Sequence, residues 1–90
     1  MSFAATPTLS ADASNALEIV EGDSVVLTCS VGEVVGAYEW RLDNEVVAGQ
    51  TGSKLVFASY SSSDDGSYTC YADNSLVSNA EELKAKQGMV

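Results

Sequence analysis

The chain has 90 residues, which suits one small domain whose limited core leaves only a narrow margin of stability. Thirteen acidic residues against four basic ones give a formal net charge of −9, and such a surface repels nucleic acid and anionic lipid. No apolar run approaches the roughly 20 residues of a membrane helix, so we expect no direct insertion into a membrane. We expect a single domain over residues 1–90, with its core over about 15–87, an N-terminal strand or extension over 1–14 and a frayed end or linker over 88–90.

Alternation of apolar and polar residues with period two recurs along the chain and predicts an all-β fold. A short strand is expected to open with Leu17 and Ile19, followed by a turn over residues 21–24. The next strand has the clearest pattern, with alternate side chains directed to one side. Its inward-facing residues are Val25, Leu27, Cys29 and Val31.

The middle of the chain continues this pattern. Tyr38, Trp40 and Leu42 share the inward phase of a further strand. Asp43 and Asn44 then predict a hairpin turn into a strand over residues 45–47. After a break over 49–52, Leu55 and Phe57 restore the alternation, and we expect another strand there.

The C-terminal part supplies the remaining strands. Tyr68, Cys70 and Ala72 alternate inward, a loop is expected over 73–79, and a last strand carries Leu83 and Ala85. About seven short strands with turns every eight to twelve residues are typical of a two-sheet antiparallel sandwich. A small β-barrel is the alternative architecture.

Cys29 and Cys70 are the only cysteines, and both fall on expected core positions. A disulfide between them would stabilise the domain by roughly 4 kcal/mol, because it closes a long loop in the unfolded chain. The alternatives are a metal site or two buried thiols. Structural zinc needs four cysteine or histidine ligands, and the chain has no histidine. A persistent disulfide favours an oxidising compartment.

Four motifs carry a family resemblance: GDSVVLTC over residues 22–29, Trp40, LVF over 55–57, and DDGSYTCYADN over 64–74. On these motifs the chain, from about residue 21 to residue 85, resembles an immunoglobulin superfamily domain of the I-set or short C2-like type. The resemblance implies an immunoglobulin-like sandwich with one disulfide between the sheets and an indole packed against it. Only fifteen positions separate Trp40 from Leu55, which argues against the two extra strands of a variable-type domain.

The resemblance also implies roles for individual core residues. The hydroxyl of Tyr68 would return to the backbone of the connection before it, and the side chain of Asp64 would bond backbone amides of the same turn. Gly66 would allow a turn geometry that a β-carbon resists. The structural core residues implied are Trp40, Leu55, Phe57, Asp64, Gly66 and Tyr68.

Catalysis finds little support in the sequence. There is no histidine to act as a general base, and no lysine is spaced to activate a serine nucleophile. We expect no enzymatic activity and no cofactor.

Acidic residues in the expected turns over 21–23, 43–45 and 64–65 would gather at the end from which the C-terminal strand leaves. Calcium takes six to eight oxygen ligands, so these carboxylates are weak calcium candidates. Against calcium, turn carboxylates commonly bond their own backbone, and no EF-hand spacing is present. The candidates are Glu21, Asp23, Asp43, Glu45, Asp64 and Asp65.

The opposite end would carry the loops over 32–36 and 73–79, which contain apolar pairs where turns usually have few. These pairs would either plug the end of the core or form an exposed patch for a protein partner. Arg41 and Tyr71 point outward by alternation and would extend such a contact, or form ordinary solvated surface. The candidate partner-binding residues are Val34, Val35, Arg41, Tyr71, Asp73, Asn74, Leu76 and Val77.

The resemblance implies a non-catalytic protein-binding module of a larger cell-surface or secreted adhesion, receptor or immune-type recognition protein. Its partner would be another protein, a second copy, or a neighbouring domain of the same chain. Two alternatives stay open. One is a spacer domain of a cytoplasmic, muscle-type filament protein, and the other is an acidic matrix module that contacts calcium or mineral.

Overall fold

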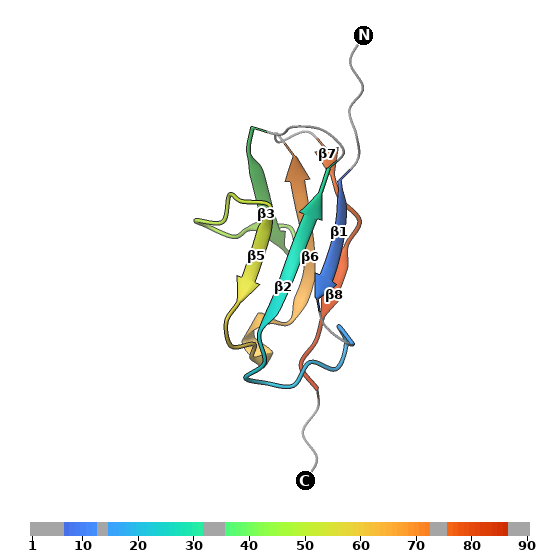
Figure 1. Cartoon of the computed structure of the whole chain (residues 1–90), viewed down its shortest axis with the longest axis vertical. Helices are drawn as coiled ribbons and strands as arrows, with labels where there is room; N and C mark the ends of the chain where they lie inside the picture. Colours follow the sequence, from blue (N-terminus) through green and yellow to red (C-terminus); the bar gives the residue numbers. More distant parts are fainter. Residues whose placement is uncertain (1–6, 13–14, 32–35, 73–75, 87–90) are drawn as a thin grey trace.

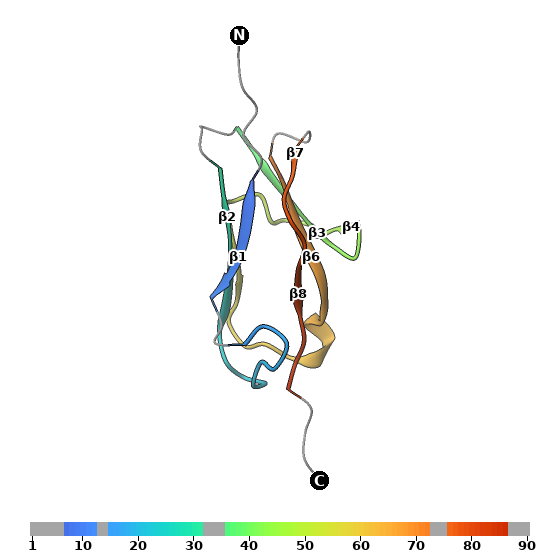
Figure 2. The same ribbon diagram turned by 90° about the vertical axis from the view of Figure 1, so that its right-hand side faces the viewer.

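The computed structural model describes residues 7–12, 15–31, 36–72 and 76–86, which form two antiparallel sheets packed face to face (Figures 1 and 2). The all-β sandwich expected from the sequence is therefore confirmed. The elements are β1 (Thr8–Asp12), β2 (Val25–Ser30), β3 (Tyr38–Leu42), β4 (Glu45–Val46), β5 (Lys54–Phe57), the short 3₁₀ helix η1 (Ser62–Asp64), β6 (Gly66–Ala72), β7 (Leu76–Val77) and β8 (Glu81–Leu83).

One sheet has three strands in the order β1-β2-β5, and the other has five. In the five-stranded sheet the order is β4-β3-β6, and both β7 and β8 pair with β6. The hairpin predicted between β3 and β4 is confirmed. Asp43 and Asn44 form its turn with φ angles of 50° and 72°, a left-handed pair that matches the twist of a tight hairpin.

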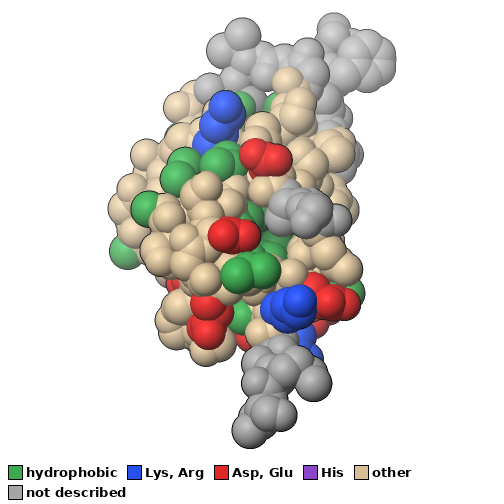
Figure 3. All heavy atoms as spheres, turned by 60° about the horizontal axis from the view of Figure 1, so that its bottom comes forward, with side chains coloured by type: hydrophobic (Ala, Val, Ile, Leu, Met, Phe, Trp, Pro, Cys, Tyr) green, Lys and Arg blue, Asp and Glu red, His purple; other side chains and the backbone are tan. Residues whose placement is uncertain are grey.

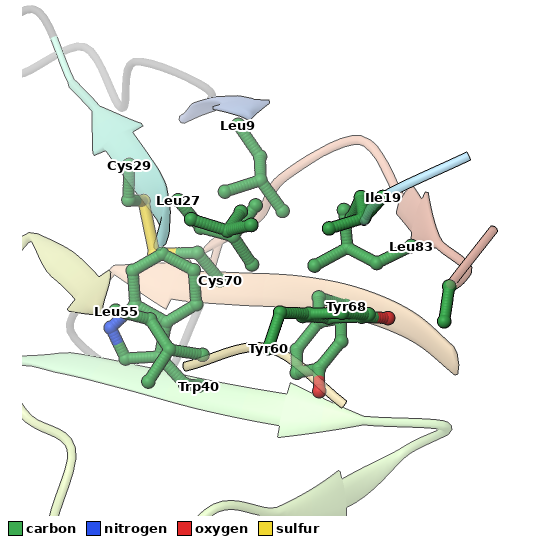
Figure 4. Packing of buried hydrophobic residues seen from close by; sticks show 12 residues of the cluster. Leu9, Ile19, Leu27, Cys29, Trp40, Leu55, Tyr60, Tyr68, Cys70 and Leu83 are labelled. Atoms are coloured by element: carbon green, nitrogen blue, oxygen red, sulfur yellow. A yellow bond between two sulfur atoms is a disulfide. The ribbon is translucent and has the colours of Figure 1, made fainter. Parts of the chain in front are cut away.

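The core lies between the sheets and is centred on a disulfide from Cys29 on β2 to Cys70 on β6, whose Cα atoms are 6.2 Å apart. Figure 4 shows the Trp40 side chain next to this bridge. The indole is fully buried, and its Nε1 atom donates a hydrogen bond to the carbonyl oxygen of Gly52 at 2.8 Å. The period-two phase of these strands therefore places both sulfur atoms and the largest side chain in one layer.

The prediction of a strand that opens with Leu17 and Ile19 is wrong. The backbone amide of Glu18 bonds the carbonyl of Asn15 at 3.1 Å, and that of Leu17 bonds the Asn15 side chain at 3.0 Å. These local bonds hold a turn, because an asparagine side chain competes with strand pairing for nearby amides. Only Ile19 pairs, in a single parallel bridge with Ala85.

The first strand lies earlier in the chain, where β1 pairs with β2 and buries Leu9. The side-chain amide of Asn79 binds this strand from the other side. Its Oδ1 atom accepts from the backbone amide of Leu9 at 2.9 Å, and its Nδ2 atom donates to the Leu9 carbonyl at 3.1 Å. A residue of the β7–β8 connection thus tethers the three-stranded sheet to the five-stranded one.

The loop expected over residues 73–79 is also partly wrong, because Leu76 and Val77 form β7. Pairing along β6 continues just beyond β7. The amide of Ser78 donates to the carbonyl of Cys70 at 2.8 Å, and the Ser78 hydroxyl accepts from the Cys70 amide at 2.9 Å. Two apolar residues in what looked like a turn are therefore strand residues.

Three aromatic rings pack at the end of the sandwich near η1. Phe57 meets Tyr60 and Tyr68 edge to face, with ring centroids 5.7 and 5.5 Å apart. The Tyr68 hydroxyl donates to the backbone oxygen of Asp64 at 2.6 Å, and the Tyr60 hydroxyl donates to Asp65 Oδ1 at 2.7 Å. The same Asp65 oxygen accepts from the amide of Ala85 at 2.8 Å, so one carboxylate links the η1 turn to the last segment.

Gly66 begins β6 with a φ angle of 151°, a conformation that favours glycine. A β-carbon at this position would collide with Cδ1 of Leu42 and crowd the Asp43 carboxylate. The backbone of β6 can therefore approach the β3–β4 turn, where the Ser67 amide donates to Asp43 Oδ1 at 3.0 Å.

These buried phenols predict a loss of stability in alkali. Burial, followed by the nearby Asp64 carboxylate, raises the pKa of Tyr68 from 10.0 to about 12. Burial and the bond to Asp65 also raise the pKa of Tyr60. Because the unfolded chain ionises these phenols first, the stability they confer is complete below about pH 10 and is lost as pH rises through about 12.

Urea unfolding at a series of pH values between 7 and this alkaline range checks the expectation. Tyr68→Phe lowers the free energy of unfolding by about 1 kcal/mol at pH 7. In this variant, the free energy of unfolding falls less steeply with rising alkaline pH than in the wild type. The control variant Tyr71→Phe, whose parent side chain lies on the outer face, keeps the wild-type decline. Parallel curves for wild type and Tyr68→Phe would contradict the assignment.

Candidate protein-binding face

The outer face of the five-stranded sheet gathers several side chains that suit a protein contact. Alternation along β3 directs Glu39 and Arg41 away from the buried Trp40. The antiparallel register sets Glu39 opposite Tyr71 of β6, so the three side chains share this face.

Arg41 is held in place on this face by two neighbours. Its Nε atom donates to Glu39 Oε2 at 2.6 Å, and its Cζ atom lies 4.3 Å from the centroid of the Tyr71 ring. The guanidinium and the carboxylate are both partly exposed, at 32% and 25% of their side-chain surface. A partner would therefore meet a side chain that is already ordered, which lowers the entropy cost of binding.

Two exposed valines flank this group. Val46 pairs with Arg41 in the β3–β4 register and is 58% exposed, while Val77 pairs with Tyr71 and is 45% exposed. We call the set Glu39, Arg41, Val46, Tyr71 and Val77 the sheet face. Arginine and tyrosine are enriched in the buried centres of protein interfaces, and apolar neighbours exclude water from such contacts.

The structure brings together three of the eight candidate partner-binding residues, namely Arg41, Tyr71 and Val77. Leu76 precedes Val77 in β7 and pairs with Ala72 of β6. Val34, Val35, Asp73 and Asn74 lie outside the described residues. Glu39 and Val46 were missed by sequence reasoning, although both are in phase with Arg41, one along its strand and one across the predicted hairpin.

The acidic candidates do not converge as the sequence led us to expect. Within the described ranges, no three histidine, cysteine, aspartate or glutamate side chains form a group that could hold a metal ion. Most of these carboxylates instead accept backbone amides, as turn carboxylates commonly do. The pairs are Glu21 with Ser62, Asp43 with Ser67, Asp64 with Ser61 and Asp65 with Ala85, at 2.8 to 3.1 Å.

The positions of the turns explain this correction. Figure 2 shows the β3–β4 hairpin projecting from the side of the sandwich. Figure 3 shows the acidic side chains near the end that carries η1 as separate groups with uncharged atoms between them. Asp23 and Glu45 are exposed. Asp43, Asp64 and Asp65 all lie near Tyr68, and Glu21 bonds the amide of Ser62 in η1. The carboxylates at this end nevertheless form no group, among the described residues, that could hold a metal ion.

A family model described as "Immunoglobulin domain" matches residues 6–74 of the chain. Among solved structures, murine CEACAM1b is 26% identical with a TM-score of 0.76, over 91% of this chain and 45% of that one. The ectodomain of mouse nectin-like molecule 4, Ig1–Ig3, is 26% identical with a TM-score of 0.74, over 97% of this chain and 32% of that one.

A third similar chain comes from the complex of a mouse coronavirus receptor-binding domain with its murine receptor. It is 26% identical with a TM-score of 0.75, over 91% of this chain and 45% of that one. The present chain thus spans less than half the length of each of these three chains. No helix in the part of the chain that the structure describes is long and apolar enough to cross a membrane.

Proposed function

Because the chain belongs to the immunoglobulin domain family, we propose that it is a non-catalytic protein-binding module of a larger cell-surface or secreted recognition protein. The observation that carries this proposal is the sheet face, where Arg41 is fixed between Glu39 and Tyr71 and flanked by exposed valines. A rigid scaffold that presents an ordered arginine and an aromatic ring binds a partner with little rearrangement.

An extracellular location fits this role. The disulfide between Cys29 and Cys70 joins the two sheets and is most stable in an oxidising compartment. Two of the similar structures are an ectodomain and a virus receptor in complex, and both chains are longer than this one. The parent protein would then place this domain outside the cell, with the sheet face open to a protein on a neighbouring surface.

Binding to an array of cell-surface and secreted ectodomains tests the proposal, with this domain displayed as a multimer so that weak contacts are detected. We expect at least one partner whose monomeric affinity falls about tenfold or more in Arg41→Ala and in Tyr71→Ala. Surface plasmon resonance with the purified domain and the purified partner measures this affinity for the wild type and each variant.

Lys54→Ala and Val56→Ala are matched controls, because both residues are exposed on the three-stranded sheet. They should bind the same partner with wild-type affinity. If a partner binds both sheet-face variants with wild-type affinity but does not bind the controls, the contact lies on the three-stranded sheet. That result would refute the assignment.

A further inference from the structure

The two edges of the three-stranded sheet differ in how they are covered. β1 forms one edge, where the Asn79 side chain bonds the outward-facing amide and carbonyl of Leu9. β5 forms the other edge, at the left of this sheet in Figure 1, and β2 is its only strand partner among the described residues. We call the outer side of β5, residues Lys54–Phe57, the β5 edge.

The hydrogen-bond phase along β5 shows which of its backbone groups face outward. The Cys29 amide donates to the Ser53 carbonyl at 2.8 Å, so this pair bonds across the ladder. Because bonded and non-bonded pairs alternate along an antiparallel ladder, Leu55 also bonds β2. The amides and carbonyls of Lys54 and Val56 therefore point away from β2.

These outward groups have a definite complement. Amides and carbonyls two residues apart along an extended strand are bonded by the same groups of another extended strand. β5 has no proline and no bulge that would block such pairing. The side chain of Val56 is 60% exposed beside the edge, so a paired strand also covers apolar surface. The occupant that fits the β5 edge is therefore a β-strand.

The distribution of charge allows a second copy of this chain to supply that strand. β2 and β5 contain no acidic residue, and β1 contains only Asp12 at its end. The strands of the other sheet contain four acidic residues, namely Glu39, Glu45, Glu81 and Glu82. Two copies that each carry a net charge of −9 therefore repel each other least where their three-stranded sheets meet.

The residues of the β5 edge are also complementary to themselves. Antiparallel pairing about a two-fold axis sets Lys54 of each copy opposite Val56 of the other, the register that uses both outward-facing residues of the strand. The aliphatic stem of Lys54 then packs on Val56, and its charged end stays in water. The same two residues thus supply both halves of the contact.

We propose that the β5 edge is a homodimer contact, in which the β5 strands of two copies pair antiparallel and join their three-stranded sheets into one continuous sheet. The contact is short, so it belongs to the weak, transient class of interfaces and forms where the local concentration of the protein is high. The sheet face lies on the other sheet and stays open, so this proposal does not depend on the proposed function.

Sedimentation velocity at concentrations from about 10 µM to about 1 mM tests this proposal and should show a monomer–dimer equilibrium. Val56→Pro removes the outward-facing amide and leaves the bonds to β2 in place, so it should weaken dimerisation about tenfold or more. Val56→Thr keeps the amide and the branched shape and should change dimerisation by less than about threefold. A wild type that stays monomeric, or a folded Val56→Pro that dimerises like the wild type, would overturn the proposal.

Hydrogen exchange of the wild-type protein makes the test independent of any loss of folding in Val56→Pro. The amides of Lys54 and Val56 should exchange more slowly as the protein concentration rises. The amide of Ala11, which shares the outward phase of Leu9 on the β1 edge, is the control and should not change. Equal slowing at both edges, or none at Lys54 and Val56, would refute pairing through β5.

Disulfide trapping tests the register. A mixture of Lys54→Cys and Val56→Cys proteins places the new thiols on directly opposed residues, whose Cα atoms would be about 5.5 Å apart and within reach of a disulfide. In either variant alone the matching positions are offset by two residues along the strand. The mixture should therefore form linked dimers about tenfold faster than either variant alone. Equal rates in all three samples would contradict the antiparallel β5 pairing.

Discussion

Replacement of both cysteines, Cys29→Ala with Cys70→Ala, lowers the free energy of unfolding by about 4 kcal/mol. The bridge spans 41 positions in sequence, and closing a loop of that length removes much of the conformational freedom of the unfolded chain. Both sulfur atoms also lie in the buried layer, so their loss leaves space next to Trp40. A 90-residue domain has few other contacts that could compensate.

Urea unfolding followed by tryptophan fluorescence measures this effect, since Trp40 is the single tryptophan and lies in the core. The wild-type protein in a reducing agent is the control, because it loses the bond and keeps the side chains. The double cysteine variant and the reduced wild-type protein should both unfold at a much lower urea concentration than the oxidised wild-type protein. A loss below about 1 kcal/mol would mean that the bridge contributes little beyond its buried volume.

Trp40→Ala lowers the free energy of unfolding by about 3 to 5 kcal/mol, the usual cost of removing a fully buried large aromatic side chain. The indole fills the layer beside the disulfide and also accounts for the bond to the Gly52 carbonyl. Without it, the segment before β5 loses its tie to the core. Trp40→Phe should cost less, because it keeps part of the packing and loses only the bond and the second ring.

Circular dichroism melts and urea unfolding in oxidising buffer measure the stability of Trp40→Ala and of Trp40→Phe. Tyr71→Ala is a suitable control, since it removes an aromatic ring of the outer sheet face and should change stability by less than about 1 kcal/mol. If Trp40→Ala and Tyr71→Ala cost the same, the indole does not have the central packing role that its burial indicates.

The sequence predicted the centre of this fold well because period-two alternation reports side-chain direction along a strand. Cys29, Trp40 and Cys70 are each in phase with apolar neighbours, so their burial follows from local pattern alone. The β3–β4 turn was equally readable, since Asp43 and Asn44 tolerate the left-handed conformation that the hairpin requires.

The sheet face could be predicted only in part, because it depends on the pairing of strands distant in sequence. The alternation of each strand shows that Arg41 and Tyr71 point outward. It does not show that they stack, since that depends on the β3–β6 register. Val46 and Val77 join them through two further pairings, each made by a strand of only two residues.

Tyr60 shows a different limit of the sequence pattern. It lies in a serine-rich stretch with no alternation, yet it is almost fully buried. Its burial depends on Phe57 packing against its ring, and on Asp65, which binds both its hydroxyl and the amide of Ala85. Contacts of this kind join three separate segments, and no local pattern of apolar residues reports them.

The side chain of Asn79 has a consequence for the solubility of the domain. Strands at the edge of a sheet present unpaired amides and carbonyls, which can recruit a strand from another molecule and start aggregation. The backbone groups of Leu9 in β1 that bond Asn79 are satisfied within the domain, by an amide group that imitates a peptide bond. The Asn79 side chain thereby takes the place of a neighbouring strand, so this part of the β1 edge cannot pair with a strand from another molecule.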